Sequence, residues 1–259
     1  RFEVMAICQA AMLGCIPIAH IHGGETTEGL IDEAVRHSIT KMSHLHFTAT
    51  DAYRNRVIQL GEIPQKVFNV GAPGIDSIKS LKLIDRNALT GSLGFDVTGP
   101  FIVVTYHPVT LNKDGALIAL ENLLSVLATY PDLNFIITYP NADTHNQALI
   151  TALEAFKKEH CDQVLLVRSL GQLRYLSLLK HCEAVIGNSS SGLIEAPTFL
   201  KPTVNIGNRQ GGRICGGTVI NSDEDVPSIT KALIKALSKD FREKCLSEHN
   251  PYGSGGSSE

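Results

Sequence analysis

The chain has 259 residues, of which 43% are hydrophobic and 19% charged, and its formal net charge is −3. This composition is typical of a globular protein with a sizeable core. In the absence of a basic block it excludes an electrostatic footprint for nucleic acid. The six cysteines form no Cys-x-x-Cys pair. This spacing argues against a zinc ribbon or disulfide framework and predicts reduced, buried thiols in a cytoplasmic protein.

The first apolar stretch, residues 4–21, resembles a signal peptide or a membrane span at first sight. Polar residues interrupt it, and Gly14 and Pro17 divide it into one half of helix length and one half of strand length. We therefore predict a buried helix over residues 2–13, a buried parallel strand over residues 16–21, and no membrane association.

Helices and strands alternate along the rest of the chain. Further helices are predicted over residues 30–42, 52–60, 116–129, 146–158 and 172–180, with a connecting helix that ends at residue 81. Strands are predicted over residues 45–48, 67–70, 101–105, 133–138, 163–167, 183–186 and 203–206. Short apolar strands separated by helices indicate parallel sheets covered on both faces. We expect an α/β fold with two doubly wound, Rossmann-like domains that face a cleft. Residues 1–75 would be the C-terminal half of the first domain and residues 76–259 the second.

The turn at residues 187–192, Gly-Asn-Ser-Ser-Ser-Gly, follows a short apolar strand and is the most informative segment. Three adjacent hydroxyls and the free N–H groups of a helix start form a cradle for phosphate. Glu195 follows the turn, and a glycine-rich loop then carries Arg209 and Arg213, which we expect to be mobile. Together these residues predict a nucleotide with a sugar attached, with a serine-rich surface turn as the simpler alternative.

Polar residues also follow other predicted strands, in the segments 20–25, 106–108 and 139–143. In open parallel sheets, ligands bind at the carboxyl ends of the strands. The segment after the first strand leads into an acidic group made of Glu25, Glu28, Asp32 and Glu33. Asp32 and Arg36 are spaced i, i+4 on the predicted helix, so the arginine can orient the carboxylate. The alternative is a solvated first turn, in which the helix dipole favours acids.

Two His-x-His pairs, His20/His22 and His44/His46, keep a metal-dependent hydrolase open as an alternative. On a strand, residues i and i+2 share a face, so either pair can offer two imidazoles to zinc. The second pair has no acidic partner at ligand spacing, and His20 follows apolar residues within the strand. We therefore predict no metal and no cofactor.

Seven segments in order carry a resemblance to a known family: Arg1-Phe-Glu, His20-Ile-His-Gly-Gly-Glu, Asp32-Glu-Ala-Val-Arg-His, His107-Pro-Val-Thr, Pro140-Asn-Ala-Asp, Gly187-Asn-Ser-Ser and Gly207-Asn-Arg-Gln. The chain resembles the hydrolysing UDP-N-acetylglucosamine 2-epimerases, which supply N-acetylmannosamine for sialic acid and related nonulosonic acids. The resemblance implies the two-domain fold of the GT-B glycosyltransferases, a UDP-sugar substrate, and a homodimer or higher homo-oligomer.

The resemblance also assigns roles residue by residue. In the second domain Ser189, Ser190 and the adjoining amides up to Gly192 would hold the pyrophosphate, Glu195 the ribose hydroxyls, and Asn141 and Arg209 would line the site. His107 would contact the diphosphate or the leaving oxygen. Acid and base chemistry would come from Asp32 and from the turn that contains His22 and Glu25, with Arg36 as an anion stabiliser.

The family scheme removes the proton at C2, expels UDP from C1 to give a glycal, and adds water with inverted configuration at C2. Many relatives have Glu where this chain has His22, which leaves open whether His22 or Glu25 shares the base role. The family also has an aspartate immediately before the position of Arg1, so we expect the 259-residue chain alone to be inactive. The sugar nucleotide stays open between UDP-N-acetylglucosamine and a diacetamido relative. A GT-B glycosyltransferase and a non-catalytic nucleotide-sugar-binding module are the alternatives.

Overall fold

A computed structural model describes residues 2–27, 31–108, 115–140 and 146–259. The chain folds into two compact units. Unit 1 comprises Arg1–Ser80, Gly211–Ile214 and Asn250–Glu259, and unit 2 comprises Leu81–Gln210 and Cys215–His249. Two short segments from the C-terminal half of the chain thus belong to unit 1. The limits that we assign to the two domains, residues 1–75 and 76–259, stay a prediction.

Unit 2 contains a six-stranded parallel sheet with the strand order β6-β5-β4-β7-β8-β9. Its strands are β4 (Phe101–Thr105), β5 (Asn134–Thr138), β6 (Val164–Val167), β7 (Ala184–Gly187), β8 (Thr203–Ile206) and β9 (Val219–Ser222). The order runs outward in one direction from β4 and in the other direction from β7. This pair is therefore the topological switch point, outside whose carboxyl ends such sheets bind ligands.

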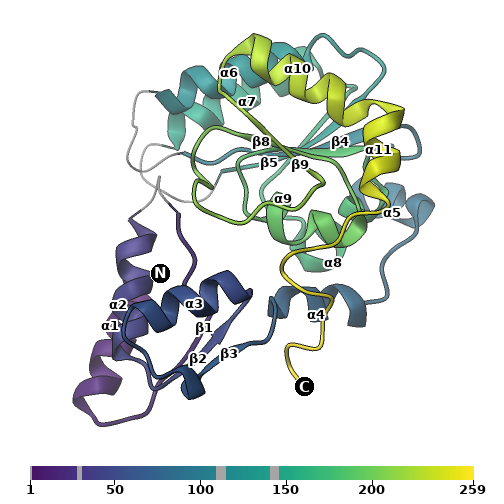
Figure 1. Ribbon diagram of the computed structural model, residues 1–259. Coiled ribbons are helices and arrows are strands. Elements are labelled where there is room, and N and C mark those ends of the chain that lie inside the picture. Colours follow the sequence, from purple (N-terminus) through teal and green to yellow (C-terminus); the bar gives the residue numbers. More distant parts are fainter. Residues whose placement is uncertain (1, 28–30, 109–114, 141–145) are drawn as a thin grey trace. The chain divides into compact units, whose positions relative to one another are not determined.

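Helices cover both faces of this sheet. On one face lie α6 (Gly115–Leu127), α7 (Gln147–Glu159) and α10 (Val226–Leu237), and on the other lie α8 (Gly171–His181) and the short α9 (Ser191–Ile194) (Figure 1). The remaining elements are α5 (Arg86–Leu93), the 3-10 helix η2 (Ala196–Phe199) and α11 (Lys239–Cys245). All five residues of β4 are buried because apolar side chains on both of its faces meet a helix layer.

Unit 1 contains a three-stranded parallel sheet with the order β1-β2-β3. Its strands are β1 (Ala19–Ile21), β2 (Leu45–Thr48) and β3 (Val67–Asn69). Its helices are α1 (Phe2–Leu13), α2 (Asp32–Met42), α3 (Asp51–Gln59), the 3-10 helix η1 (Pro64–Lys66) and α4 (Pro73–Ser80). One face of the sheet carries the buried side chains of His46, Thr48 and Val67, and α3 packs over β2 and β3.

The other face of this small sheet is apolar and exposed to solvent. Ile21, Leu45 and Phe68 are 56%, 40% and 43% exposed, and Phe47 stacks on Phe68 with ring centroids 5.6 Å apart. The prediction of sheets covered on both faces is therefore confirmed for unit 2 and wrong for unit 1. The physical reason is that a strand is buried only where a second layer packs on it, and no described residue supplies that layer here.

The N-terminal helix shows the same difference. α1 has the predicted bounds, but Ile7 and Leu13 are exposed, and β1 is three residues shorter than predicted. The predicted burial of both elements is wrong, because α1 is apolar on all sides and only one of its sides contacts α2. None of the helices in the described ranges is long and apolar enough to cross a bilayer.

The C-terminal segment of unit 1 packs through one buried aromatic pair. The hydroxyl of Tyr252 lies 3.1 Å from that of Tyr53 and donates to the carbonyl of Ile214 at 3.0 Å. The N–H of Ile214 in turn donates to the Tyr53 hydroxyl at 3.1 Å. Tyr53 therefore holds both the 211–214 segment and the C-terminal segment in unit 1.

Sequence reasoning found most elements within about three residues but missed β9, α10 and α11. Their signals are ordinary ones: the Asp225 side chain caps α10 by accepting the N–H of Ser228, and a proline follows the cap. All six cysteines are free, as predicted. Their predicted burial is right for Cys8, Cys182 and Cys245, and wrong for the other three.

Candidate active site

The carboxyl ends of β4 and β7 are joined by a single buried asparagine. The backbone N–H of Asn188 donates to the carbonyl of Thr105 at 3.1 Å. Its side chain accepts the N–H of His107 at 2.8 Å and donates to the His107 carbonyl at 2.9 Å. Asn188 thus fixes the backbone of His107 beside the serine turn, at the switch point of the sheet. In the sequence it stood out only as part of a motif.

Gly187, which precedes this asparagine, cannot be replaced by a larger residue without distortion. Its φ is +135°, and a Cβ atom here would lie 2.0 Å from the carbonyl oxygen of Thr105. The glycine therefore lets β7 approach β4 closely at the point where the turn begins.

The serine turn leads into one turn of α-helix, α9, rather than a long helix. The N–H groups of Gly192 and Leu193 already donate to the carbonyls of Ser189 and Ser190, at 3.2 and 3.0 Å. The hydroxyl oxygen of Ser191 accepts a hydrogen bond from the hydroxyl of Tyr175 at 2.8 Å. Because these groups already have partners, the groups of the turn that can still bind an anion belong to Ser189 and Ser190.

Two buried side chains from the loop after β8 converge on the same turn. Nη1 of Arg209 and Nε2 of Gln210 donate to the carbonyl of Asn188 at 3.0 and 2.8 Å. Arg209 is 3% exposed, so the prediction of a mobile arginine is wrong. A guanidinium fixed against the residue that precedes Ser189 suits a diphosphate, because it offers several donors in a rigid plane. Gln210 was missed, although it is the last residue of the 207–210 motif.

Glu195 lines a cavity of about 360 Å³ in unit 2. The other lining residues end β5, follow β6 or belong to α8: Thr138, Ser169, Leu170, Gly171, Gln172, Tyr175 and Leu176. Burial raises the pKa of Tyr175, so its hydroxyl stays a neutral donor. A partly apolar cavity of this size with one carboxylate suits the sugar and base of a nucleoside. Asn141, the other residue predicted here, lies outside the described residues.

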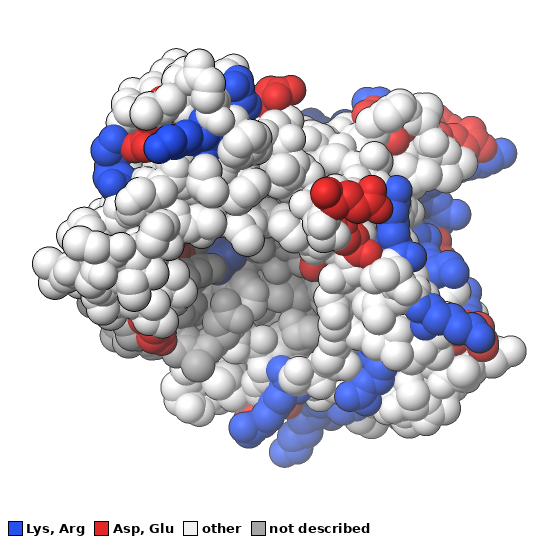
Figure 2. Space-filling model, turned by 90° about the horizontal axis from the view of Figure 1, so that it is seen from below, with Lys and Arg blue, Asp and Glu red and all other residues white. Residues whose placement is uncertain are grey.

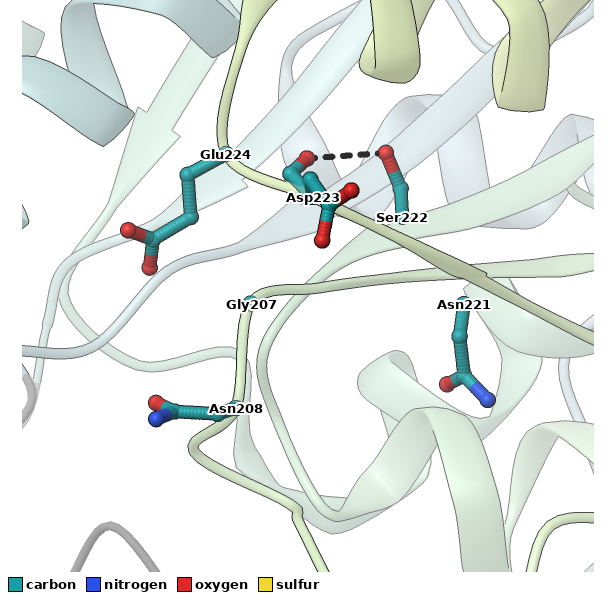
Figure 3. Close-up of a pocket in the computed structure, with 6 residues that line it drawn as sticks. All are labelled: Gly207, Asn208, Asn221, Ser222, Asp223 and Glu224. Atoms are coloured by element: carbon teal, nitrogen blue, oxygen red, sulfur yellow. Dashed lines mark hydrogen bonds between the residues drawn. The ribbon is translucent and has the colours of Figure 1, made fainter.

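A second pocket of unit 2, about 440 Å³ in volume, is acidic (Figure 3). Its lining comes from the ends of β8 and β9: Gly207, Asn208, Asn221, Ser222, Asp223 and Glu224. The Glu224 carboxylate accepts the hydroxyl of Tyr106 at 3.4 Å and packs against Gly207, which has no side chain to obstruct it. Two carboxylates repel phosphate groups. A diphosphate would therefore fit the serine turn better than this acidic pocket. The acidic pocket was not predicted from the sequence.

In unit 1 a pocket of about 180 Å³ brings together three of the predicted catalytic residues, His22, Asp32 and Arg36. The other lining residues are Val4, His20, Ile21, Val35 and Ile39. Asp32 is buried at the first position of α2, and His22 directly follows β1. Nη1 of Arg36 donates to the carbonyl of Glu25 at 3.0 Å and to the Thr27 hydroxyl at 3.3 Å. Arg36 therefore ties the loop after β1 to α2.

Glu25 is buried in the same unit but does not line this pocket. Its Oε1 lies 3.1 Å from Nδ1 of His22, and its Oε2 lies 2.8 Å from Nη2 of Arg213. Burial by itself raises the pKa of Glu25, but the hydrogen bond from His22 and the charge of Arg213 outweigh it and hold the pKa below its usual range. Arg213, which was expected to be mobile, is instead held in an ion pair of unit 1, with its side chain only 9% exposed.

The histidines of the two His-x-His pairs have separate partners. His20 bonds the Thr40 hydroxyl at 3.2 Å, and burial lowers its pKa to about 4. Nδ1 of His44 accepts the N–H of Ile18, and Nε2 of His46 lies 3.1 Å from Glu62. Within the ranges that the structure describes, no three His, Cys, Asp or Glu side chains are grouped so that they could hold a metal ion.

The face of the molecule in Figure 2 carries both basic and acidic side chains, and neither sign covers it alone. A continuous basic stripe of the kind that tracks a nucleic-acid backbone does not occur among the described residues of this face.

A six-stranded parallel sheet in this order, with an asparagine–serine turn and a buried arginine at its switch point, defines a Rossmann-type fold. The family model described as UDP-N-acetylglucosamine 2-epimerase matches residues 1–259, and the chain belongs to this family. The family resemblance read from the motifs is therefore confirmed.

Two curated relatives are close in sequence. The chain is 37% identical over 243 residues to the GDP/UDP-N,N'-diacetylbacillosamine 2-epimerase (hydrolyzing) of Campylobacter jejuni, covering 94% of this chain and 63% of that protein. It is 39% identical over 257 residues to the polysialic acid biosynthesis protein P7 of Escherichia coli, covering 97% of this chain and 64% of that protein. The chain thus spans somewhat less than two thirds of these relatives.

A solved structure supports the predicted fold. The crystal structure of UDP-GlcNAc 2-epimerase from Neisseria meningitidis bound to UDP-GlcNAc matches with a TM-score of 0.82 at 21% identity, covering 98% of this chain and 71% of that one. The predicted α/β fold of the GT-B type is confirmed by this match and by the parallel sheets of both units.

Proposed function

We propose that the protein is a hydrolysing sugar-nucleotide 2-epimerase, which converts a UDP-linked 2-acetamido sugar and water into UDP and the free 2-epimer. The observation that carries this proposal is the group made by His107, Asn188 and Arg209 at the switch point of unit 2, in a chain of the UDP-N-acetylglucosamine 2-epimerase family. The substrate is UDP-N-acetylglucosamine or a diacetamido relative such as UDP-N,N'-diacetylbacillosamine, the sugar nucleotide named for the Campylobacter relative.

Unit 2 would bind the UDP. Ser189 and Ser190, with the fixed guanidinium of Arg209, would hold the diphosphate, whereas the N–H of Gly192 already donates to the Ser189 carbonyl. Glu195 would accept the ribose hydroxyls at the edge of its cavity, with Asn141 as a further ligand. These groups stabilise the negative charge that grows on the diphosphate as the C1–O bond breaks. Because the donors are fixed before UDP arrives, little reorganisation is needed during the reaction.

Unit 1 would supply the proton chemistry. One small pocket is lined by Asp32, Arg36 and His22. Glu25 does not line this pocket but contacts His22. A base removes the C2 proton, the C–H electron pair forms the C1–C2 double bond, and the C1–O pair leaves with UDP. Water then adds to C1 and a proton to the opposite face of C2, so two proton-transfer groups are needed. His22 and Asp32 are the two candidates, and His107 would contact the departing oxygen.

The location, assembly and pathway of the enzyme also belong to this proposal. The enzyme would act in the cytoplasm without a metal or cofactor, as a homodimer or higher homo-oligomer, in a pathway that makes sialic acid or a related nonulosonic acid. Residues 1–75 would form the acid–base side and residues 76–259 the UDP-binding side.

The test is an NMR time course in deuterated water, with the native polypeptide that contains these residues and either UDP-N-acetylglucosamine or its diacetamido relative. We expect free 2-epimerised sugar with deuterium at C2, and the faster substrate identifies the sugar. Protium retained at C2 would contradict the proposal. Sugar release only after an acceptor is added would instead support the glycosyltransferase alternative.

Two substitutions separate the roles of the units. Asp32→Asn should lower kcat by about 10³-fold or more while the affinity for UDP stays the same, since one of the two proton-transfer groups is lost and the UDP ligands are not. Asp51→Asn is a matched control, because Asp51 also occupies the first position of a helix in unit 1 but is exposed. Ser190→Ala should weaken UDP binding about tenfold, since one hydrogen bond to a charged group is lost. Normal turnover in Asp32→Asn would show that the acid–base residue lies elsewhere.

A further inference from the structure

We infer that Glu25 and Arg213 form a positioning pair that holds the His22 imidazole with its proton on Nδ1, so that Nε2 is the proton-transfer atom and Glu25 never acts as the base. This inference rests on the proposed function for its chemistry. Its structural part concerns only the side chains of unit 1 and can be tested without turnover.

The first support is the occupancy of the Glu25 carboxylate. Each oxygen has its own partner: Oε1 faces Nδ1 of His22 at 3.1 Å and Oε2 faces Nη2 of Arg213 at 2.8 Å. The Glu25 side chain is only 3% exposed. A carboxylate with both oxygens bonded and almost no access to solvent is poorly placed to reach a substrate hydrogen.

The second support is the backbone that carries these side chains. His22 has a φ of +64°, a conformation that costs energy for any residue with a Cβ atom, and its N–H still donates to the carbonyl of Phe47 at 2.9 Å. Gly24 has a φ of +81°, and a Cβ atom there would lie 2.3 Å from the carbonyl oxygen of Tyr53. The loop is thus held in a strained shape that turns Glu25 back onto His22.

The third support is the set of bonds that fix the loop from outside. Arg36 donates to the carbonyl of Glu25, Arg56 donates to the carbonyl of Gly24, and the Thr26 hydroxyl donates to the carbonyl of Gly212. The segment 211–214 therefore supplies both a backbone acceptor and the guanidinium that neutralises Glu25. These contacts of the segment restrain the geometry of the loop that carries His22 and Glu25.

Together these contacts fix the proton on the histidine ring. An ionised Glu25 can only accept a hydrogen bond, so Nδ1 carries the hydrogen and Nε2 keeps its lone pair. Nε2 has no hydrogen-bond partner among the residues that the structure describes, and His22, unlike Glu25, lines the pocket with Asp32. In the proposed reaction the C2 proton goes to Nε2, and the C–H electrons form the double bond as the C1–O pair leaves. The ring then bears a positive charge, which Glu25 stabilises without changing its own protonation.

The structural part is tested on the 259-residue chain by ¹⁵N NMR of the imidazole nitrogens. In the wild type we expect a protonated Nδ1 and an unprotonated Nε2 for neutral His22, and in Glu25→Gln a mixture of the two tautomers. A single tautomer with hydrogen on Nε2 in the wild type would overturn the inference. So would an unchanged single tautomer in both Glu25→Gln and Glu25→Ala.

The catalytic part is tested in the native polypeptide by a double-mutant cycle. Glu25→Gln should lower kcat about 10²-fold or more with little change in KM. His22→Gln should lower kcat at least as much, and the double variant should be no worse than His22→Gln, because the two residues act as one unit. Glu25→Asp should recover part of the loss if positioning is what matters.

Glu62→Gln is the matched control, since Glu62 pairs with His46 at the same 3.1 Å but neither residue lines the pocket. It should leave kcat within about twofold. If His22→Gln retains activity while Glu25→Gln loses it, Glu25 is itself the base and the inference is wrong. If the wild type shows no C2 exchange at all, the proposed function fails, and the NMR result still decides the positioning pair.

Discussion

The two sheets of this protein show how far apolar sequence determines burial. In unit 2 the strand β4 is buried at every position, with helices on both of its faces. In unit 1 the short strands are equally apolar on one face, yet Ile21, Leu45 and Phe68 are exposed. Strand-forming sequence therefore specifies the strand, whereas burial depends on a second layer of structure. Unit 2 has that layer within its own residues.

The strand ends of the two units differ in a related way. In unit 2, Asn188 clamps the end of β4 through three hydrogen bonds, and Arg209 is fixed against it. In unit 1, His22 is held in a strained conformation by contacts from several segments. In the proposed reaction, the rigid group of unit 2 would bind the diphosphate and the strained loop of unit 1 would carry a proton-transfer residue.

The largest expected contrast is between fragments. Residues 81–249 contain the six-stranded sheet and both of its helix layers, so they should fold alone and melt cooperatively. Residues 1–80 should not fold alone, because they lack the segments 211–214 and 250–259, which contact Tyr53 and Glu25 in unit 1. Circular dichroism during heating and the dispersion of amide NMR signals measure both. A cooperative melt of the 1–80 fragment would show that both fragments fold alone and would contradict this prediction.

At the strand ends, Gly187→Ala should destabilise unit 2 by at least about 3 kcal/mol, since its Cβ would overlap the carbonyl of Thr105. Gly171→Ala is the matched control in the same unit. Gly171 also has a positive φ, +64°, but nothing lies within 4 Å of its added Cβ. It should cost only about 1 kcal/mol of left-handed strain. Urea unfolding of both variants gives the two free energies, and equal losses would show that the close approach is unimportant.

The third contrast compares two isoleucines on strands. Ile102→Ala in β4 removes a side chain that is fully buried and should cost about 3 kcal/mol. Ile21→Ala in β1 removes one that is 56% exposed and should cost about 1 kcal/mol or less. Amide hydrogen exchange of each strand reports the local loss. A large effect at Ile21 would mean that the apolar face of unit 1 is covered in solution.

The last effect concerns acid. The pKa of His20 falls from 6.5 to about 4 in the folded chain, first through burial and then through the positive groups His46, Arg36, His22 and His37. Since the folded pKa is lowered, the unfolded chain takes up the proton first as the pH falls. The stability of unit 1 is therefore full above about pH 6.5 and declines toward pH 4, by about 3 kcal/mol.

His20→Gln should flatten that decline, because glutamine does not titrate. Hydrogen exchange of β1 and β2, measured at a series of pH values in both proteins, tests this. The same slope in the variant would show that another group causes the acid sensitivity.

Local patterns in the sequence account for much of this protein. The spacing of apolar residues in short runs predicts the strand–helix alternation, and glycine and serine after an apolar run mark the turn at residues 187–192. These signals are local, so they can be read without knowledge of the tertiary structure. The prediction that polar residues gather at the carboxyl ends of strands is equally general, and His22 and Asp32 do meet in one pocket.

The partner that each polar group takes was visible only in the tertiary structure. Arg213 was expected to be mobile but neutralises Glu25, and Asn188 looked like one residue of a turn but joins two strands. The open face of the small sheet was also invisible in the sequence. Ion pairs, clamps and covering layers join residues that are up to about two hundred positions apart, and no local pattern records which of several available partners is reached.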